Sequence, residues 1–193
     1  KLTNSIPGLP EIAGSLFAEI NYRGDNKSDR LNCDLKIDSL GYEGNNIGNE
    51  RVRLTYTSYE GNSGNADLTL SHNNRTVAHI NSDIDISTTT FSNGKITLTQ
   101  FPLAIANAII GEEGASINGY MNSSIDISGT LDNIVGNGFL NFDSTYIYIP
   151  LLGTTLRPSE ENITIKNSQI NFNRFQIYDK SSNPFVINGT VNI

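Results

Sequence analysis

Cysteine, cationic residues and long apolar runs are scarce in this chain of 193 residues. Its one cysteine, Cys33, cannot form a disulfide within the chain. The 13 Lys and Arg against 20 Asp and Glu give a formal net charge of -7, which argues against nucleic acid, because phosphate binding requires clustered cations. The sequence has no run of 18 apolar residues and no signal peptide, so we expect a segment of a longer protein whose membrane anchor lies elsewhere.

Sequence motifs of enzymes are also missing. There is no Gly-x-Ser-x-Gly, no phosphate-binding loop and no dinucleotide fingerprint. The two histidines, His72 and His79, lack the spacing of a zinc site. Asp83 and Asp85 alternate with isoleucines, which indicates an acidic outer face of a strand rather than a catalytic pair. We therefore expect a protein that is not an enzyme, with no catalytic residue, metal or cofactor.

Alternation of apolar and polar residues with a period of two is the dominant pattern. One example is Leu31, Cys33, Leu35 and Ile37, and about a dozen short runs of this kind are separated by turns rich in Gly and Asn. No alternation of strands and helices appears, so the pattern predicts an all-β antiparallel sheet. Each strand has one apolar face that must be buried away from water, and a barrel, a sandwich or a curled half-pipe would each bury it.

Local signals place the turns and one helix. The residues 1–13, rich in proline and glycine, predict a linker or edge, and the rest of 1–193 a single β-rich domain. Asn73-Asn74 predicts a tight turn, and Ser92-Asn93-Gly94 predicts a hairpin. In 101–111, apolar residues at offsets of three and four predict a short amphipathic helix. Three short strands set off by glycines should follow it.

This order of pieces resembles the C-terminal region of the TamB family, DUF490-type proteins within the AsmA-like group of envelope proteins. The family has a helix after a "FPL" segment, a Gly-x-hydrophobic strand, an "isoleucine-Ser-Gly-Thr-Leu" strand and a second Gly-x-Leu strand. The matching residues here are Phe101–Leu103, Gly119, Ile127–Leu131, Gly138 and Leu140. The closing stretch KNSQINFNRFQIYDKSSNPFVINGTVNI also looks like the paired strands that end the family's proteins.

The resemblance implies an elongated antiparallel sheet curled into a U-shaped half-pipe, the β-taco, with an aliphatic lining. It implies a periplasmic segment of a bridge, anchored in the inner membrane, that shields lipid acyl chains in a hydrophobic groove for phospholipid transport to the outer membrane, or that assists outer-membrane protein assembly. The partners it implies are phospholipid acyl chains, an outer-membrane barrel protein and adjoining repeats of the full-length chain.

Parity along the strands then selects the side chains expected to line this groove. They are Leu16, Ile20, Leu35, Leu54, Leu68, Leu70, Ile84, Ile86, Ile96, Leu98, Ile125, Ile127, Leu140, Phe142, Ile163, Ile165, Phe172 and Val191. Unpaired first and last strands predict edge-to-edge self-association of the fragment. The alternative from another class is a structural or adhesive β-sandwich module of a bacterial cell surface, whose apolar face is filled by its own side chains.

Overall fold

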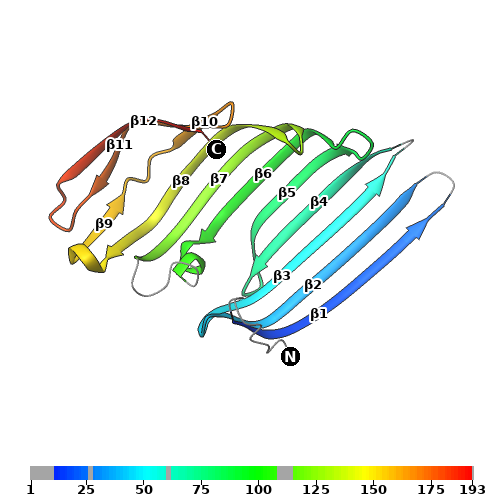
Figure 1. The fold of residues 1–193 in the computed structure, drawn as a ribbon, viewed down its shortest axis with the longest axis horizontal. Helices are drawn as coiled ribbons and strands as arrows, with labels where there is room; N and C mark the ends of the chain where they lie inside the picture. Colours follow the sequence, from blue (N-terminus) through cyan, green and yellow to red (C-terminus); the bar gives the residue numbers. More distant parts are fainter. Residues whose placement is uncertain (1–10, 26–27, 60–61, 108–114, 193) are drawn as a thin grey trace. The chain divides into compact units, whose positions relative to one another are not determined.

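The computed structural model describes residues 11–25, 28–59, 62–107 and 115–192. Twelve antiparallel strands make up most of this part of the chain (Figure 1). Their bounds are β1 Ile12–Gly24, β2 Asp29–Tyr42, β3 Asn45–Ser58, β4 Ser63–His72, β5 Arg75–Asp85, β6 Thr90–Pro102, β7 Ser116–Thr130, β8 Asn133–Ile149, β9 Thr154–Pro158, β10 Ile163–Lys166, β11 Gln169–Tyr178 and β12 Pro184–Asn192. Two short 3-10 helices, η1 Leu103–Ala106 and η2 Pro150–Leu152, follow β6 and β8.

The strands form one sheet, which confirms the predicted antiparallel all-β fold. The order follows the chain from β1 to β8 and continues with β10, β11 and β12, while β9 pairs with both β8 and β11. A sandwich, with its two separate sheets, is not what the hydrogen bonding describes. The chain divides into two compact units, which we describe one at a time: unit 1 is Lys1–Ile96 with Asp126–Ile134, and unit 2 is Thr97–Ile125 with Val135–Ile193.

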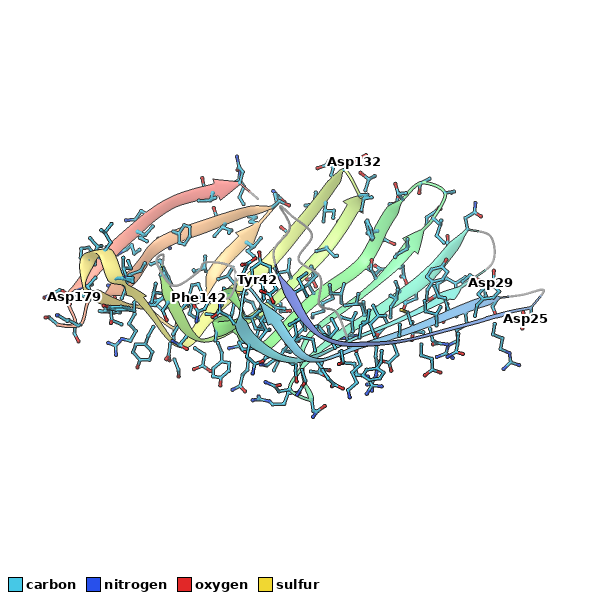
Figure 2. All side chains as sticks on the ribbon, turned by 60° about the horizontal axis from the view of Figure 1, so that its bottom comes forward. Asp25, Asp29, Tyr42, Asp132, Phe142 and Asp179 are labelled. Carbon is cyan, nitrogen blue, oxygen red and sulfur yellow. The ribbon has the colours of Figure 1, made fainter. Side chains whose placement is uncertain are left out.

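Unit 1 begins with a meander in which each strand pairs with the next. Figure 2 shows Asp25 and Asp29 at one end of β1 and β2, and Tyr42 at the opposite end of β2. The predicted tight turn at Asn73-Asn74 is confirmed: both residues have positive φ, 48° and 66°, and they connect β4 to β5. Such a turn suits a two-residue hairpin because its twist matches that of the strands.

The predicted hairpin at Ser92-Asn93-Gly94 is wrong, because these residues lie inside β6. The chain turns earlier, after Asp85, whose Oδ1 accepts the N–H groups of Ser87 at 2.9 Å and Thr88 at 3.2 Å. An aspartate that satisfies two backbone donors in this way stabilises a turn. Asn93 keeps its positive φ of 50°, but its amide donates to Asp83 at 3.0 Å, across the strand pair rather than within a turn.

The helix predicted over 101–111 lies only partly within the described residues, which show a 3-10 turn followed by Asn107 in a helical conformation. Phe101 and Pro102 still belong to β6, and η1 is one 3-10 turn. Asn107 fixes its end by accepting the N–H of Ile117 on β7 at 2.7 Å and donating to the carbonyl of Ile117 at 2.8 Å. The remainder of the predicted helix, 108–111, lies outside the described residues.

The three short strands predicted between this turn and Phe142 are two long ones, β7 and β8. The glycines expected to separate them lie within the strands. Gly119 and Gly129 adopt φ values of 106° and 121°, which side-chain-bearing residues rarely adopt, and a Cβ at Gly138 would collide with the backbone of β7. Glycine here allows irregular backbone and close strand contact without ending the strand.

Asparagine side chains stabilise several irregular strand positions. At three residues with positive φ on separate strands, the backbone N–H is accepted by the Oδ1 of an asparagine on the neighbouring strand, at 2.8 to 2.9 Å. The pairs are Ser39 with Asn49, Gln100 with Asn122, and Arg174 with Asn188. The N–H that leaves the regular ladder thus keeps a partner, which gives part of the abundant asparagine a structural role.

Candidate functional site

Cross-strand registers in unit 1 place apolar side chains opposite one another across five strands. Leu68 of β4, for example, lies opposite Leu54 of β3 and Ile80 of β5. Opposed residues of an antiparallel sheet share a face. The rows from β1 to β5 are Ala18, Leu35, Val52, Leu70 and Ala78, then Ile20, Cys33, Leu54, Leu68 and Ile80, then Tyr22, Leu31, Tyr56, Ala66 and Ser82. We call this surface the apolar face of unit 1.

The apolar face of unit 1 is only partly shielded from solvent. On β1, Leu16, Ile20 and Tyr22 are 48%, 66% and 68% exposed. The apolar side chains of β2, β3 and β4 on this face are half-buried, and the buried apolar residues described in unit 1 are Val77 and Ala78. A contiguous apolar surface that remains accessible on this scale is typical of a binding surface.

One ionisable pair lies on the same face. Glu50 lies opposite Ile37 on one side and His72 on the other, and its Oε1 is 2.5 Å from His72 Nδ1. Their side chains are 11% and 18% exposed, and Asn73 Nδ2 lies 2.9 Å from His72 Nε2. The hydrogen-bonded carboxylate and imidazole lie next to Ile37, so the rows of aliphatic side chains end at a polar pair on this side.

The opposite face of unit 1 is polar. One row from β1 to β5 is Glu19, Asp34, Arg53, Thr69 and His79, and the next is Asn21, Asn32, Thr55, Asp67 and Asn81. The exposed pair of His79 and Asp67, 2.7 Å apart, connects the two rows, and the amide of Asn81 donates to Asp67 at 3.1 Å within the second row. A shallow depression of about 260 Å³ over β1, β2 and β3 is lined mainly by polar groups. The sheet of unit 1 therefore separates an apolar surface from a hydrogen-bonded polar one.

Acid stability should depend on Asp34, which lies on this polar face. Arg51 donates to both carboxylate oxygens of Asp34, at 2.7 and 2.5 Å, and lowers its pKa from 3.8 to about 2, with a smaller contribution from Arg53. Because the pKa is lower in the folded protein, the pair stabilises the fold above pH 3.8 and loses that contribution as the pH falls through about 2. Unfolding free energies measured from pH 5 to pH 2 should fall less steeply for Asp34→Asn than for the wild type; parallel curves would contradict this assignment.

Unit 2 has a closer-packed apolar cluster. The Phe175 ring lies 6.3 Å from that of Phe142 and 5.9 Å from that of Phe172, measured between centroids in tilted arrangements. A register shift in β11, where Arg174 has a φ of 54°, turns Phe172 and Phe175 to the same face. Nearby, Ile163 lies opposite Leu140 and is only 4% exposed.

Most of the predicted lining residues fall into two sets, each brought together within its own unit. In unit 1, Leu16, Ile20, Leu35, Leu54, Leu68, Leu70 and Ile84 lie on the apolar face. In unit 2, registers align Leu140, Ile163, Ile165, Phe172 and Val191, and Phe142 joins them through Phe175.

The other predicted lining residues are more scattered. Ile86 lies in the turn after β5 and is 57% exposed, so it is not on a strand face. Ile127 fills the space that a side chain at Gly94 would need, and Ile125 lies beside Gly136. The last two, Ile96 and Leu98, are half-buried residues of β6.

Several residues of these surfaces were absent from the predicted lining. Val52 and Ile80 belong to the rows of unit 1, and the alternation of their strands would have found them. Phe175, 4% exposed, could not be found in that way, because the register shift in β11 changes the parity between it and Phe172.

No family model, curated protein or solved structure matches this chain. The resemblance to the TamB family therefore stays a prediction from the residues quoted above. None of the helices that the structure describes is both long enough and apolar enough to span a membrane. Within the same described ranges, no group of three or more His, Cys, Asp or Glu side chains is placed to hold a metal ion.

Proposed function

We propose that this chain is a non-enzymatic lipid-shielding segment, in which the apolar face of unit 1 covers acyl chains. The observation that carries the proposal is the register of β1 to β5, which gathers aliphatic side chains on one accessible face and polar side chains on the other. Such a sheet stays hydrated on its polar face while its apolar face excludes water from a bound hydrocarbon.

The energetics of this surface favour holding hydrocarbon without fixing it in place. Each methylene transferred from water to an apolar surface contributes about 0.8 kcal/mol, so half-covering an ordinary acyl chain contributes several kcal/mol. The rows repeat similar aliphatic residues, so a chain that shifts by one row finds a similar environment. This is the behaviour expected of a conduit rather than of a selective pocket.

The TamB resemblance extends this proposal to a place in the cell. In that proposal the segment belongs to a periplasmic bridge, anchored in the inner membrane, that carries phospholipid to the outer membrane or assists outer-membrane protein assembly. An outer-membrane barrel protein and adjoining repeats of the full-length chain would be its partners. The support for this step is the order of the sequence motifs from Phe101 to the end of the chain.

Binding of a fluorescent fatty acid tests the lipid-shielding proposal. We expect saturable binding by the wild type and about tenfold weaker binding by Ile20→Asp, because a charge replaces an aliphatic contact worth roughly 1.5 kcal/mol or more. Ile20 is 66% exposed on the edge strand β1, so the variant should still fold.

Phe17→Asp is the matched control for this measurement. Phe17 is on the same strand and 59% exposed, but it lies opposite Lys36 on the polar face of unit 1. The proposal requires Phe17→Asp to bind the fatty acid as the wild type does. Equal weakening by both variants, or no saturable binding by the wild type, would reject it and favour the structural module filled by its own side chains.

A further inference from the structure

The turn between β8 and β9 presents two consecutive leucines to solvent. In η2, Leu151 is 91% exposed and Leu152 is 67% exposed. The turn is closed by a 3.0 Å hydrogen bond from the N–H of Gly153 to the carbonyl of Pro150, with Gly153 at a φ of 56°. Proline and a left-handed glycine thus form a tight turn that keeps both leucines directed away from unit 2.

Two tyrosines lie on β8 just before this turn. Tyr146 and Tyr148 are 49% and 45% exposed and, two residues apart, they share one face of the strand. Between them, Ile147 faces the other way and pairs with Leu156 of β9. Tyrosine has an apolar ring and a polar hydroxyl, which suits it to the boundary between hydrocarbon and water.

A polar turn followed by an exposed phenylalanine lies at the same end of unit 2. β8 and β11 both run antiparallel to β9, so the turn after β11 is on the side of η2 (Figure 1). Asp179 in this turn is labelled in Figure 2. Phe185, which follows this turn, is 60% exposed. The carboxylate of Asp179 accepts the N–H groups of Ser181 and Asn183, both at 2.8 Å, and is thereby satisfied within the turn.

Cationic groups accompany these apolar side chains. Arg157 of β9 lies opposite Tyr178 and places its guanidinium 5.5 Å from the centre of that ring. Lys180, in the turn after β11, is exposed. Cations at this end of unit 2 match the phosphates that lie above the hydrocarbon of a bilayer.

We propose that this end of unit 2, formed by η2, Tyr146 and Tyr148, docks onto a phospholipid bilayer. Leu151 and Leu152 enter the boundary between headgroups and acyl chains, and the two tyrosines lie at headgroup level. A projecting turn with adjacent leucines fits a deformable lipid surface better than a protein surface, which would need a complementary pocket. The proposal concerns a whole bilayer and other residues, so it does not rest on acyl-chain binding by unit 1.

A tryptophan reporter tests this docking, because the chain contains no tryptophan. Leu152→Trp should shift its indole emission to the blue when phosphatidylcholine vesicles are added, and lipids brominated near the headgroup end of the acyl chain should quench it. Leu131→Trp is the matched control, since Leu131 is 64% exposed but lies in the turn between β7 and β8, in unit 1. Equal shifts in both variants, or none in Leu152→Trp, would overturn the proposal.

Co-sedimentation with vesicles, using protein without the tryptophan reporter, completes the test. Replacing both Leu151 and Leu152 by serine should weaken binding to phosphatidylcholine vesicles at least tenfold and leave fatty-acid binding unchanged. Ile20→Asp should show the opposite pattern, so failure of one proposal is distinguishable from failure of the other. Apolar insertion requires the wild-type binding to persist at high salt; binding that occurs only with added phosphatidylglycerol and disappears with salt would contradict insertion.

Discussion

Replacing Phe175 by alanine should lower the free energy of unfolding by about 3 to 5 kcal/mol, the usual cost of removing a buried phenylalanine. Phe175 is 4% exposed, and its ring packs against those of Phe142 and Phe172. The substitution removes both aromatic contacts and leaves a cavity that the surrounding strands cannot fully close. Urea unfolding, followed by far-ultraviolet circular dichroism, measures the change.

Phe185→Ala is the matched control. Phe185 is in the neighbouring strand β12, where it lies opposite Ile177, and it is 60% exposed. Its truncation should therefore cost less than about 1 kcal/mol, as exposed substitutions usually do. Similar losses for the two variants would mean that Phe175 is not the centre of the packing in unit 2.

The strands of unit 1 were predictable because the alternation of apolar and polar residues that defines each strand lies within that strand's own sequence. Leu54 and Leu68 follow a period of two within their own strands, and opposed residues share a face in any antiparallel pairing. Parity along each strand is therefore enough to define the apolar face before any pairing is known. The pairing itself, such as that of Leu68 with Ile80, comes only from the structure.

The irregular positions were not predictable, because their stabilising partners lie on other strands. Arg174 adopts a positive φ, and Asn188 of β12 accepts its N–H at 2.8 Å. Nothing near Arg174 in the sequence indicates a bulge, so parity counted from Phe172 places Phe175 on the opposite face and excludes it from the predicted lining. Similarly, Ser92-Asn93-Gly94 has the composition of a hairpin, but the turn forms at Asp85, whose carboxylate satisfies the backbone there.

The end of unit 2 around η2 was predictable in part. The run from Tyr146 to Ile149 has apolar or aromatic residues on both faces, which indicates a strand that is sandwiched or partly exposed for binding. The sequence also places the end of the strand at Pro150, as the structure does. Which side of the strand faces solvent follows only from the structure, where Tyr146 and Tyr148 are exposed and Ile147 is half-buried.

Gly138→Ala should destabilise the protein by about 3 kcal/mol or more, because the new methyl group has no room. A Cβ at Gly138 would collide with the carbonyl oxygen of Ser124 and lie 2.7 Å from the Cα of Ile125, both backbone atoms of β7. Backbone cannot move aside as a side chain can, so β7 and β8 must separate locally, and the hydrogen bond from Ser123 Oγ to the carbonyl of Phe139, 2.8 Å long, would be strained with them.

Gly41→Ala separates this steric effect from the general effect of replacing a strand glycine. A Cβ at Gly41 would have its nearest neighbours, Ala13 Cβ and the carbonyl oxygen of Asn45, at 3.4 Å, which is ordinary contact. Neither glycine has a φ in the left-handed region. Both substitutions therefore stabilise the protein to the same extent by lowering the conformational entropy of the unfolded chain. We expect Gly41→Ala to change the free energy of unfolding by less than about 1 kcal/mol. If Gly138→Ala also changes the free energy of unfolding by less than about 1 kcal/mol, β7 and β8 do not approach closely at Gly138. The presence of glycine in the Gly-x-Leu motif would then need another explanation.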